Sequence, residues 1–409
     1  MSELPIDQRP MTEARRLSRP EFVAMMALLF ATVAFSIDAM LPALPQIGRE
    51  LTPESLNHAQ YVITVFVAGM GLGTLFAGPL SDSFGRKRVI LGGAALYLAG
   101  AVLAGLGQSL ELMLLGRAVQ GLGAAAPRVV ALAVVRDLYA GRDMARIVSF
   151  VMTIFTLLPA IAPLIGAGII ALAGWRAIFG AFLVFSLLSI GWYALRQPET
   201  LPVAGRRPLR AAPLIEAARE VFADPVARIA VLVQTLVFSV LFMTLTSIQQ
   251  VFDIHFERGD GFPLWFGLIA VIAGSASFTN AMLVGKLGMR FLIRTTLIAQ
   301  MGISGVMAVM FWAGLWPDWA AFPAFVLWAI TLFGMLGLTI GNLNALAMEP
   351  LGHIAGMAAS IMGALATVFS AILAAPVGQA FDGTPRPLAL GVFLAVTAAV
   401  ALMTRLPER

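Results

Sequence analysis

The 409-residue sequence contains no cysteine and few charged residues. Without cysteine, disulfide bonds, thiol catalysis and cysteine-ligated metals are excluded. Lys, Arg, Asp and Glu make up only 12% of the chain, whereas a soluble domain carries roughly a quarter of such residues. Because 59% of the residues are hydrophobic and the mean hydropathy is +0.89, the chain is expected to lie in a lipid bilayer.

Other signals are also missing. The three histidines, His58, His255 and His353, fall at predicted loop or helix ends, and their spacing makes no metal site. No phosphate-binding P-loop is present, so ATP-driven transport by this chain alone is not expected. We expect neither a metal nor a cofactor. The first apolar run is longer than the core of a signal peptide, which predicts an uncleaved first helix.

Long apolar runs bounded by charge, proline or glycine predict an all-α integral membrane protein. A spanning helix takes about 20 residues. The predicted spans are 21–45, 57–80, 88–107, 111–136, 146–172, 175–195, 225–252, 263–285, 291–314, 319–346, 354–381 and 387–404.

The positive charges indicate how these spans are oriented. The net charge is +5, and 21 of the 27 Lys and Arg residues fall in the termini and loops on one side of the predicted spans. This distribution follows the positive-inside rule, so it indicates topology rather than a nucleic-acid partner. Both termini are therefore expected in the cytoplasm.

A charged, proline-rich segment at 196–224 divides six spans from six. It ends in residues 214–222, which have the pattern of an amphipathic helix on the inner membrane surface. We therefore predict a tail at 1–20, a six-helix bundle at 21–195, a linker at 196–224 and a second six-helix bundle at 225–409. Transporters built from such repeats bind their substrate between the halves, near the membrane midplane.

Glycines, one acid and three bases lie between the second and third spans, in the segment Gly78 to Arg88. The glycines and proline permit a tight reversal, and the bases hold it on the cytoplasmic side. We expect a charge network here that closes an intracellular gate; a solvated loop is the alternative. The predicted gating residues are Gly78, Asp82, Gly85, Arg86, Lys87, Arg136 and Asp137.

Asp38 is the one carboxylate well inside a predicted span, about 24 Å along the first helix from Phe22. An ionised acid in hydrocarbon costs several kcal/mol, so Asp38 is expected to face a cavity, pair with a base or take up a proton. Arg117 is predicted at a similar depth, and a pair between them, direct or through water, would act as a proton switch. A helix-end acid facing external water and a fixed structural ion pair remain as alternatives.

The predicted substrate cavity draws on both halves. Arg117, Gly121, Ala124 and Arg128 share a helical face, whose small residues predict either an open stripe or tight helix packing. The second half has few ionisable groups but several amides and aromatics, which suits amphipathic ligands. The predicted cavity residues, for which ordinary helix packing is the alternative, are Gln120, Arg128, Gln234, Phe238, Phe242 and Asn342.

The fifth span carries two prolines and two glycines, Pro159, Pro163, Gly166 and Gly168. Proline removes backbone hydrogen bonds, and small residues let helices approach closely. This span is therefore expected to bend and slide against a partner helix.

These patterns together resemble the major facilitator superfamily, in particular its twelve-helix drug:proton antiporter group. The segment Gly78 to Arg88 is similar to the superfamily's signature between the second and third helices. Within the group the chain resembles the bicyclomycin and chloramphenicol resistance subfamily, through Asp38 to Pro45, Arg117 with Gln120 and Gly121, Val135 to Tyr139, Pro159 to Gly168 and Gly174 to Phe179.

The resemblance implies a proton-coupled antiporter that exports small amphipathic compounds across the bacterial inner membrane by alternating access. Asp38 would bind the proton, Arg117 would be its coupling partner, and Asp82 with Arg86 would form the cytoplasmic gate. The chain has Phe30 where some related antiporters carry a second acid, and Ala162 where many have glycine. Neutral rather than cationic compounds are therefore the expected substrates. The protein is expected to be a monomer, with protons and the lipid bilayer as its other partners.

Two other classes of protein remain open. A metabolite transporter, for amino-acid derivatives or sugars, would use the same scaffold. A polytopic membrane enzyme or sensor is more remote, because the spans contain one acid and two arginines rather than a catalytic cluster, and no signalling domain fits. We therefore expect a transporter and not an enzyme.

Overall fold

A computed structural model describes residues 17–407, except for the side chains of residues 156 and 211. This part of the chain folds into helices and turns without any strand, which confirms the predicted all-α class. The predicted tail at 1–20 lies almost entirely outside the described residues.

Twelve of the helices are long. Their bounds are α1 Arg19–Asp38, α3 Tyr61–Phe84, α4 Arg86–Gly105, α5 Leu110–Leu138, α6 Gly141–Ala173, α7 Ala177–Arg196, α9 Pro225–Gln250, α10 Phe262–Leu287, α11 Met289–Ala313, α12 Asp318–Met348, α13 Ala355–Gln379 and α14 Arg386–Met403. Within residues 17–407, eleven apolar segments could cross a membrane. One of them, Asp318–Gln379, contains both α12 and α13, which a 3-10 segment with non-helical Leu351 separates.

The first predicted span is wrong in one respect, because it does not form a single helix through residue 45. Helix α1 ends at Asp38, a 3-10 turn covers Leu41–Ala43, and the short helix α2 follows at Leu44–Leu51. Pro42 and Pro45 lack the backbone N–H that an uninterrupted helix would need here. Asp38 therefore occupies a helix C-terminus, where the backbone carbonyls disfavour a negative charge.

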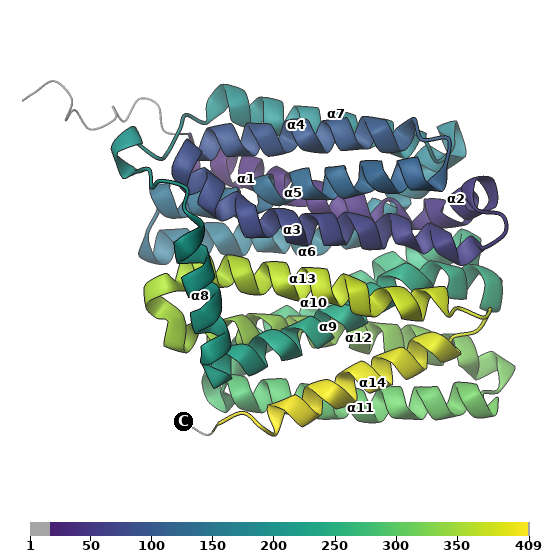
Figure 1. Ribbon diagram of the computed structural model, residues 1–409. Coiled ribbons are helices and arrows are strands. Elements are labelled where there is room, and N and C mark those ends of the chain that lie inside the picture. The colour runs from purple at the N-terminus through teal and green to yellow at the C-terminus, as the bar shows by residue number, and fades with distance from the viewer. Residues whose placement is uncertain (1–16, 408–409) are drawn as a thin grey trace, which may run out of the picture.

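The helices form two bundles that lie side by side (Figure 1). Helices α1 to α7 form the N-terminal bundle and α9 to α14 form the C-terminal bundle. The linker helix α8, Ala211–Ala223, runs across one end of the C-terminal bundle, where it contacts α9 and α13, while α2 lies at the opposite end of the molecule. We call these the α8 end and the distal end.

Glycines allow α3, α4 and α5 to pack backbone against backbone. A Cβ atom added to Gly123 of α5 would lie 2.3 Å from the Tyr97 nitrogen of α4, and one added to Gly121 would lie 2.1 Å from the Phe66 oxygen of α3. Such distances are too short for any side chain. The stripe is therefore a packing surface at Gly121, one of the two options that the sequence left open, whereas Arg128 at its end faces a cavity between the bundles.

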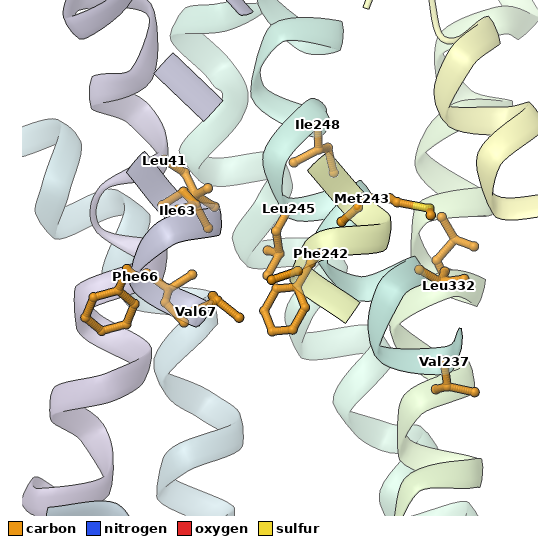
Figure 2. Close-up of a cluster of buried hydrophobic side chains, with 14 of the residues drawn as sticks. Leu41, Ile63, Phe66, Val67, Val237, Phe242, Met243, Leu245, Ile248 and Leu332 are labelled. Carbon is orange, nitrogen blue, oxygen red and sulfur yellow. The ribbon is translucent and has the colours of Figure 1, made fainter. Parts of the chain in front are cut away.

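A buried apolar cluster extends across the contact between the bundles. Figure 2 shows Phe66 and Val67 of α3 on one side and Phe242 and Leu245 of α9 on the other. The outer surface is also apolar, with large side chains such as Leu172 and Leu195 almost fully exposed at 90% and 87%. A surface of this kind is stable against lipid tails rather than water.

Candidate functional site: a cavity between the two bundles

A cavity of about 270 Å³ lies between the bundles. Helices α1, α3, α5 and α6 contribute to its wall from one bundle, and α9, α10, α12 and α13 from the other. Its lining is mainly apolar, with Phe155, Phe238, Phe242, Phe266 and Phe333 among the residues that enclose it. Asp38 and Arg128 are the ionisable residues in the wall, and Thr367 adds a hydroxyl.

Asp38 reaches this cavity from the last turn of α1. Its exposed fraction is 5%, and within residues 17–407 its carboxylate forms neither an ion pair nor a hydrogen bond. A buried carboxylate without a partner is strongly disfavoured in its ionised form, so the cavity favours the protonated acid. The sequence-based expectation that Asp38 faces a cavity agrees with this position.

The direct pair between Asp38 and Arg117 is not present. The Arg117 guanidinium, which is fully buried, donates to the Val62 carbonyl (3.1 Å), the Ser36 carbonyl (3.0 Å) and Gln120 Oε1 (2.7 Å). It also stacks 4.2 Å from the Phe66 ring centroid. Two carbonyls and an amide thus satisfy the arginine, which links α1, the start of α3 and α5.

The other predicted cavity residues divide into two groups. Arg128, Phe238 and Phe242 line the cavity, whereas Gln120, Gln234 and Asn342 do not. Gln120 accepts the hydrogen bond from Arg117. Asn342 donates to Asn280 Oδ1 (2.7 Å) and to the Leu338 carbonyl (2.9 Å), so it joins α12 to α10. Gln234 is buried, and its Oε1 atom has no partner among the described residues.

Helix α6 brings its proline- and glycine-rich segment beside the cavity. Pro159 lies in the cavity wall, and Pro163 is buried. Gly166 packs on the chain next to Asp38, since a Cβ there would lie 2.2 Å from the Ala39 oxygen, whereas a Cβ at Gly168 would meet nothing within 4 Å. Of the two glycines, only Gly166 is required for close packing against the end of α1.

A charge network forms at the α8 end, as the sequence predicted. Arg86 forms ion pairs with Asp82 of α3 and with Asp137 of α5, where the distance from Arg86 Nε to Asp137 Oδ2 is 3.1 Å. It also donates a hydrogen bond to Ser81 Oγ (2.7 Å). Arg136 takes no part in it and instead lines a neighbouring hollow of about 430 Å³ at this end. Gly78 faces α13, where an added Cβ would lie 3.1 Å from Ser360 Oγ.

The sequence analysis missed Glu199, which completes this network from the linker. Its two carboxylate oxygens accept from the backbone N–H groups of Arg86 (2.9 Å) and Lys87 (3.1 Å) at the start of α4. A carboxylate there compensates both the unpaired N–H groups and the helix dipole. Gly85, at φ +100°, is needed because a Cβ would lie 2.5 Å from Glu199 Oε2. The sequence signal that could have identified Glu199 is its position as an acid within an arginine-rich linker.

Replacing Glu199 by glutamine is expected to loosen the linker from the bundle. Loss of a charged helix cap costs roughly 1 kcal/mol, so the linker would detach several times more often. Limited trypsin digestion after Arg206 should then proceed several-fold faster. Glu216→Gln on the exposed face of α8 is the matched control, since Glu216 forms no side-chain bond among the described residues. Equal digestion rates for the two variants would contradict this function of Glu199.

Amide side chains and backbone carbonyls join the two bundles at the distal end. Asn57 Nδ2 donates to the Gln379 carbonyl (3.0 Å) and the Phe381 carbonyl (2.8 Å), and Gln379 Nε2 donates back to the Asn57 carbonyl (2.9 Å). Asn57 precedes α3, and Gln379 is the last residue of α13. The distal end of the interface is therefore closed by hydrogen bonds between uncharged groups, to which the ion pair between Arg49 of α2 and Asp253 after α9 (3.9 Å) is added.

Gln60 forms the buried part of this closure, which we call the amide clasp. Its Nε2 donates to Gln250 Oε1 at the end of α9 and to the Gly378 carbonyl (3.0 Å). A Cβ at Gly378 would lie 1.9 Å from Gln60 Oε1, so the clasp needs glycine there. The sequence analysis did not identify the clasp, although all its members fall at the predicted external ends of spans.

Replacing Gln60 by alanine is expected to open the distal end more often. Two buried hydrogen bonds are lost, each worth about 1 kcal/mol net, so the open population should rise on the order of tenfold. Because the chain has no cysteine, Leu245→Cys in the cavity wall provides a single site for a membrane-impermeant maleimide applied from the distal side.

The matched control for this variant is Thr244→Ala. The Thr244 hydroxyl donates only to the Val240 carbonyl of its own helix (2.7 Å), so its loss leaves the clasp intact. Unchanged labelling in Gln60→Ala would show that the clasp does not hold the distal end closed.

The two bundles and the cavity that they share define a polytopic membrane transporter. A family model described as Major Facilitator Superfamily matches residues 26–375. The chain belongs to the major facilitator superfamily, and it is a transporter rather than an enzyme, as predicted.

Relatives cover most of the chain. A protein named uncharacterized MFS-type transporter YdgK, from Bacillus subtilis (strain 168), is 27% identical over 95% of this chain and 94% of its own length. A bicyclomycin resistance protein homolog from Haemophilus influenzae is 28% identical over 90% and 91%. Multidrug resistance protein MdtL from Escherichia fergusonii is 30% identical over 80% of each chain. The resemblance to the bicyclomycin-resistance group is thereby confirmed.

Solved structures agree in fold. The crystal structure of a D-xylose-proton symporter superposes with a TM-score of 0.73 at 17% identity, covering 95% of this chain and 98% of the symporter. At that identity the similarity concerns the fold alone.

Proposed function

We propose that the protein is a proton-coupled antiporter that exports small amphipathic compounds across the bacterial inner membrane. The observation that carries the proposal is Asp38, a buried carboxylate without a partner in a cavity that both bundles line. Such an acid is stable when protonated and is driven to release its proton when it becomes hydrated or meets a cation. Coupling follows if the proton and the substrate occupy this cavity in turn.

The amide clasp supports alternating access, because it joins the two bundles at one end of the cavity. With the α8 end in the cytoplasm, the clasp is the outer gate. The Arg86 network, whose members all belong to the N-terminal bundle and the linker, lies beside the hollow at the cytoplasmic end and is the candidate inner gate. The positive charge of the termini and linker favours this orientation. The clasp itself is uncharged, whereas opening of the outer gate also separates the ion pair between Arg49 and Asp253 (3.9 Å).

The apolar wall defines the chemistry of the substrate. Aromatic rings from both bundles enclose a space of about 270 Å³, which suits a compact apolar body with few polar groups. The relatives named for bicyclomycin and multidrug resistance support drug-like compounds over sugars.

The proposal is tested in two steps. Cells that lack their own major exporters are given this chain and screened for resistance to a broad compound panel that includes amphenicols and bicyclomycin. Each compound that gives resistance is then added to energised everted vesicles, where export by antiport releases protons from the acidified lumen. Compound-dependent proton release is the expected result. Accumulation of a compound that persists after the pH gradient is collapsed would refute the coupling.

A further inference from the structure

Arg128 is the one cation in the cavity wall, and the described residues do not neutralise it. Its Nη1 atom lies 3.8 Å from the Met70 sulfur, a weak acceptor, and no carboxylate lies within ion-pair distance. Asp38 lines the same cavity but forms no ion pair or hydrogen bond with it. Arg128 thus differs from Arg117, eleven residues earlier on α5, whose guanidinium has three oxygen partners.

We infer that Arg128 binds an anionic group of the substrate, so that the transported class is small organic anions with an apolar body. A guanidinium has five N–H donors in a planar fork that fits a carboxylate or sulfonate in a bidentate manner. The inference rests on the proposed function, because it assigns the substrate of that same cavity.

Among the described residues, the cavity wall offers the Arg128 guanidinium a sulfur atom but no oxygen acceptor within hydrogen-bond distance. An arginine surrounded by phenylalanine and methionine side chains has lost much of its hydration without gaining an oxygen partner. A ligand anion supplies those hydrogen bonds in a mainly apolar cavity, where charge-assisted bonds are strong. A neutral ligand of the same shape leaves the donors unpaired, and such sites discriminate strongly between ligands.

The remaining wall determines what the anion is attached to. Phe238, Phe242 and Leu245 of α9 and Phe333 of α12 provide an aromatic and aliphatic surface in the other bundle. A ligand whose anionic group meets Arg128 in the N-terminal bundle therefore places its apolar body against the C-terminal bundle. One such molecule would contact both bundles, as alternating access requires.

The test uses two probes of nearly equal shape, 2-naphthoate and 2-naphthamide, with the purified full-length protein and equilibrium dialysis at neutral pH. The parent should bind the carboxylate at least about tenfold more tightly than the amide. Arg128→Gln should reduce this preference to less than about threefold, and Arg128→Lys should retain part of it. Arg294→Gln, at an exposed position of α11 without a side-chain bond among the described residues, is the matched control and should keep the full preference.

Three results would overturn the inference: equal affinity of the parent for the two probes, no binding of 2-naphthoate, or an unchanged preference in a folded Arg128→Gln variant. Thermal unfolding of each variant checks its folding. Proton release with neutral compounds but no binding of 2-naphthoate would reject the anion site and keep proton-coupled export. Binding of 2-naphthoate that depends on Arg128, without proton release, would keep the anion site and reject the coupling.

Discussion

Replacing Asp38 by asparagine is expected to reduce uphill transport to the level of vesicles without the protein. The amide has nearly the same shape as the protonated acid but cannot release a proton, so substrate movement loses its driving force. The variant should remain folded, with a thermal unfolding temperature equal to or above that of the parent, because Asp38 forms no bond that the substitution breaks. Substrate movement down its own gradient should persist.

The measurement is substrate-dependent proton release in energised vesicles, with the fraction of folded protein determined in the same preparation. Asp38→Glu is the matched control: it keeps the titratable group and should retain measurable coupling, weakened by the longer side chain. If Asp38→Asn drove substrate uphill on an imposed pH gradient as well as the parent does, another group would carry the proton.

Replacing Arg117 by leucine is expected to destabilise the protein severely. The substitution leaves the buried carbonyls of Val62 and Ser36 and the Gln120 amide oxygen without their donor. A hydrogen bond to a charged group is worth about 1.5–3 kcal/mol, and an unsatisfied buried acceptor adds its own desolvation cost. A total loss of about 3 kcal/mol or more should lower the unfolding temperature in detergent by many degrees and reduce the yield of folded protein.

The variant Arg117→Lys distinguishes a structural role of Arg117, as a clamp that holds α1, α3 and α5 together through its hydrogen bonds, from a direct role in proton coupling. Lysine keeps the positive charge but replaces the planar fork with a single ammonium group, so only part of the stability should return. A structural clamp therefore predicts that stability and transport fall together across the two variants. A leucine variant with the stability of the parent and no coupling would instead support the sequence-based hypothesis that Arg117 is the proton-coupling partner.

Hydropathy was enough to locate the spans, because each helix must satisfy its own backbone in lipid and therefore leaves a long apolar run in the sequence. The predicted run at 88–107, for example, corresponds to α4 at Arg86–Gly105. The break after Asp38 was missed because the residues on both sides are apolar, so that only Pro42 and Pro45 marked it. Asp38 itself was identifiable, since an acid inside an apolar run is rare.

Side-chain partners were not predictable in the same way. The depths of Asp38 and Arg117 along their helices suggested a pair, but depth does not specify which face of each helix meets the other. In the structure, the Arg117 side chain points toward Phe66 and the α1 backbone, whereas Asp38 lies in the cavity wall. Glu199 was missed because its partners are backbone groups, which every residue possesses. The amide clasp was missed because one partner of Gln60 is a backbone carbonyl and the other is an amide 190 residues away.

Composition and hydropathy alone indicated that this chain crosses a membrane about a dozen times, that its positive loops share one side, and that a single acid lies well inside the first apolar run. These properties depend on composition and on the cost of moving a charge into hydrocarbon, which can be evaluated one segment at a time. Only the tertiary structure decided that Asp38 is unpaired, that Arg117 is a clamp and that Arg128 faces an apolar cavity, because hydrogen bonds and cavities depend on how rotated helices meet.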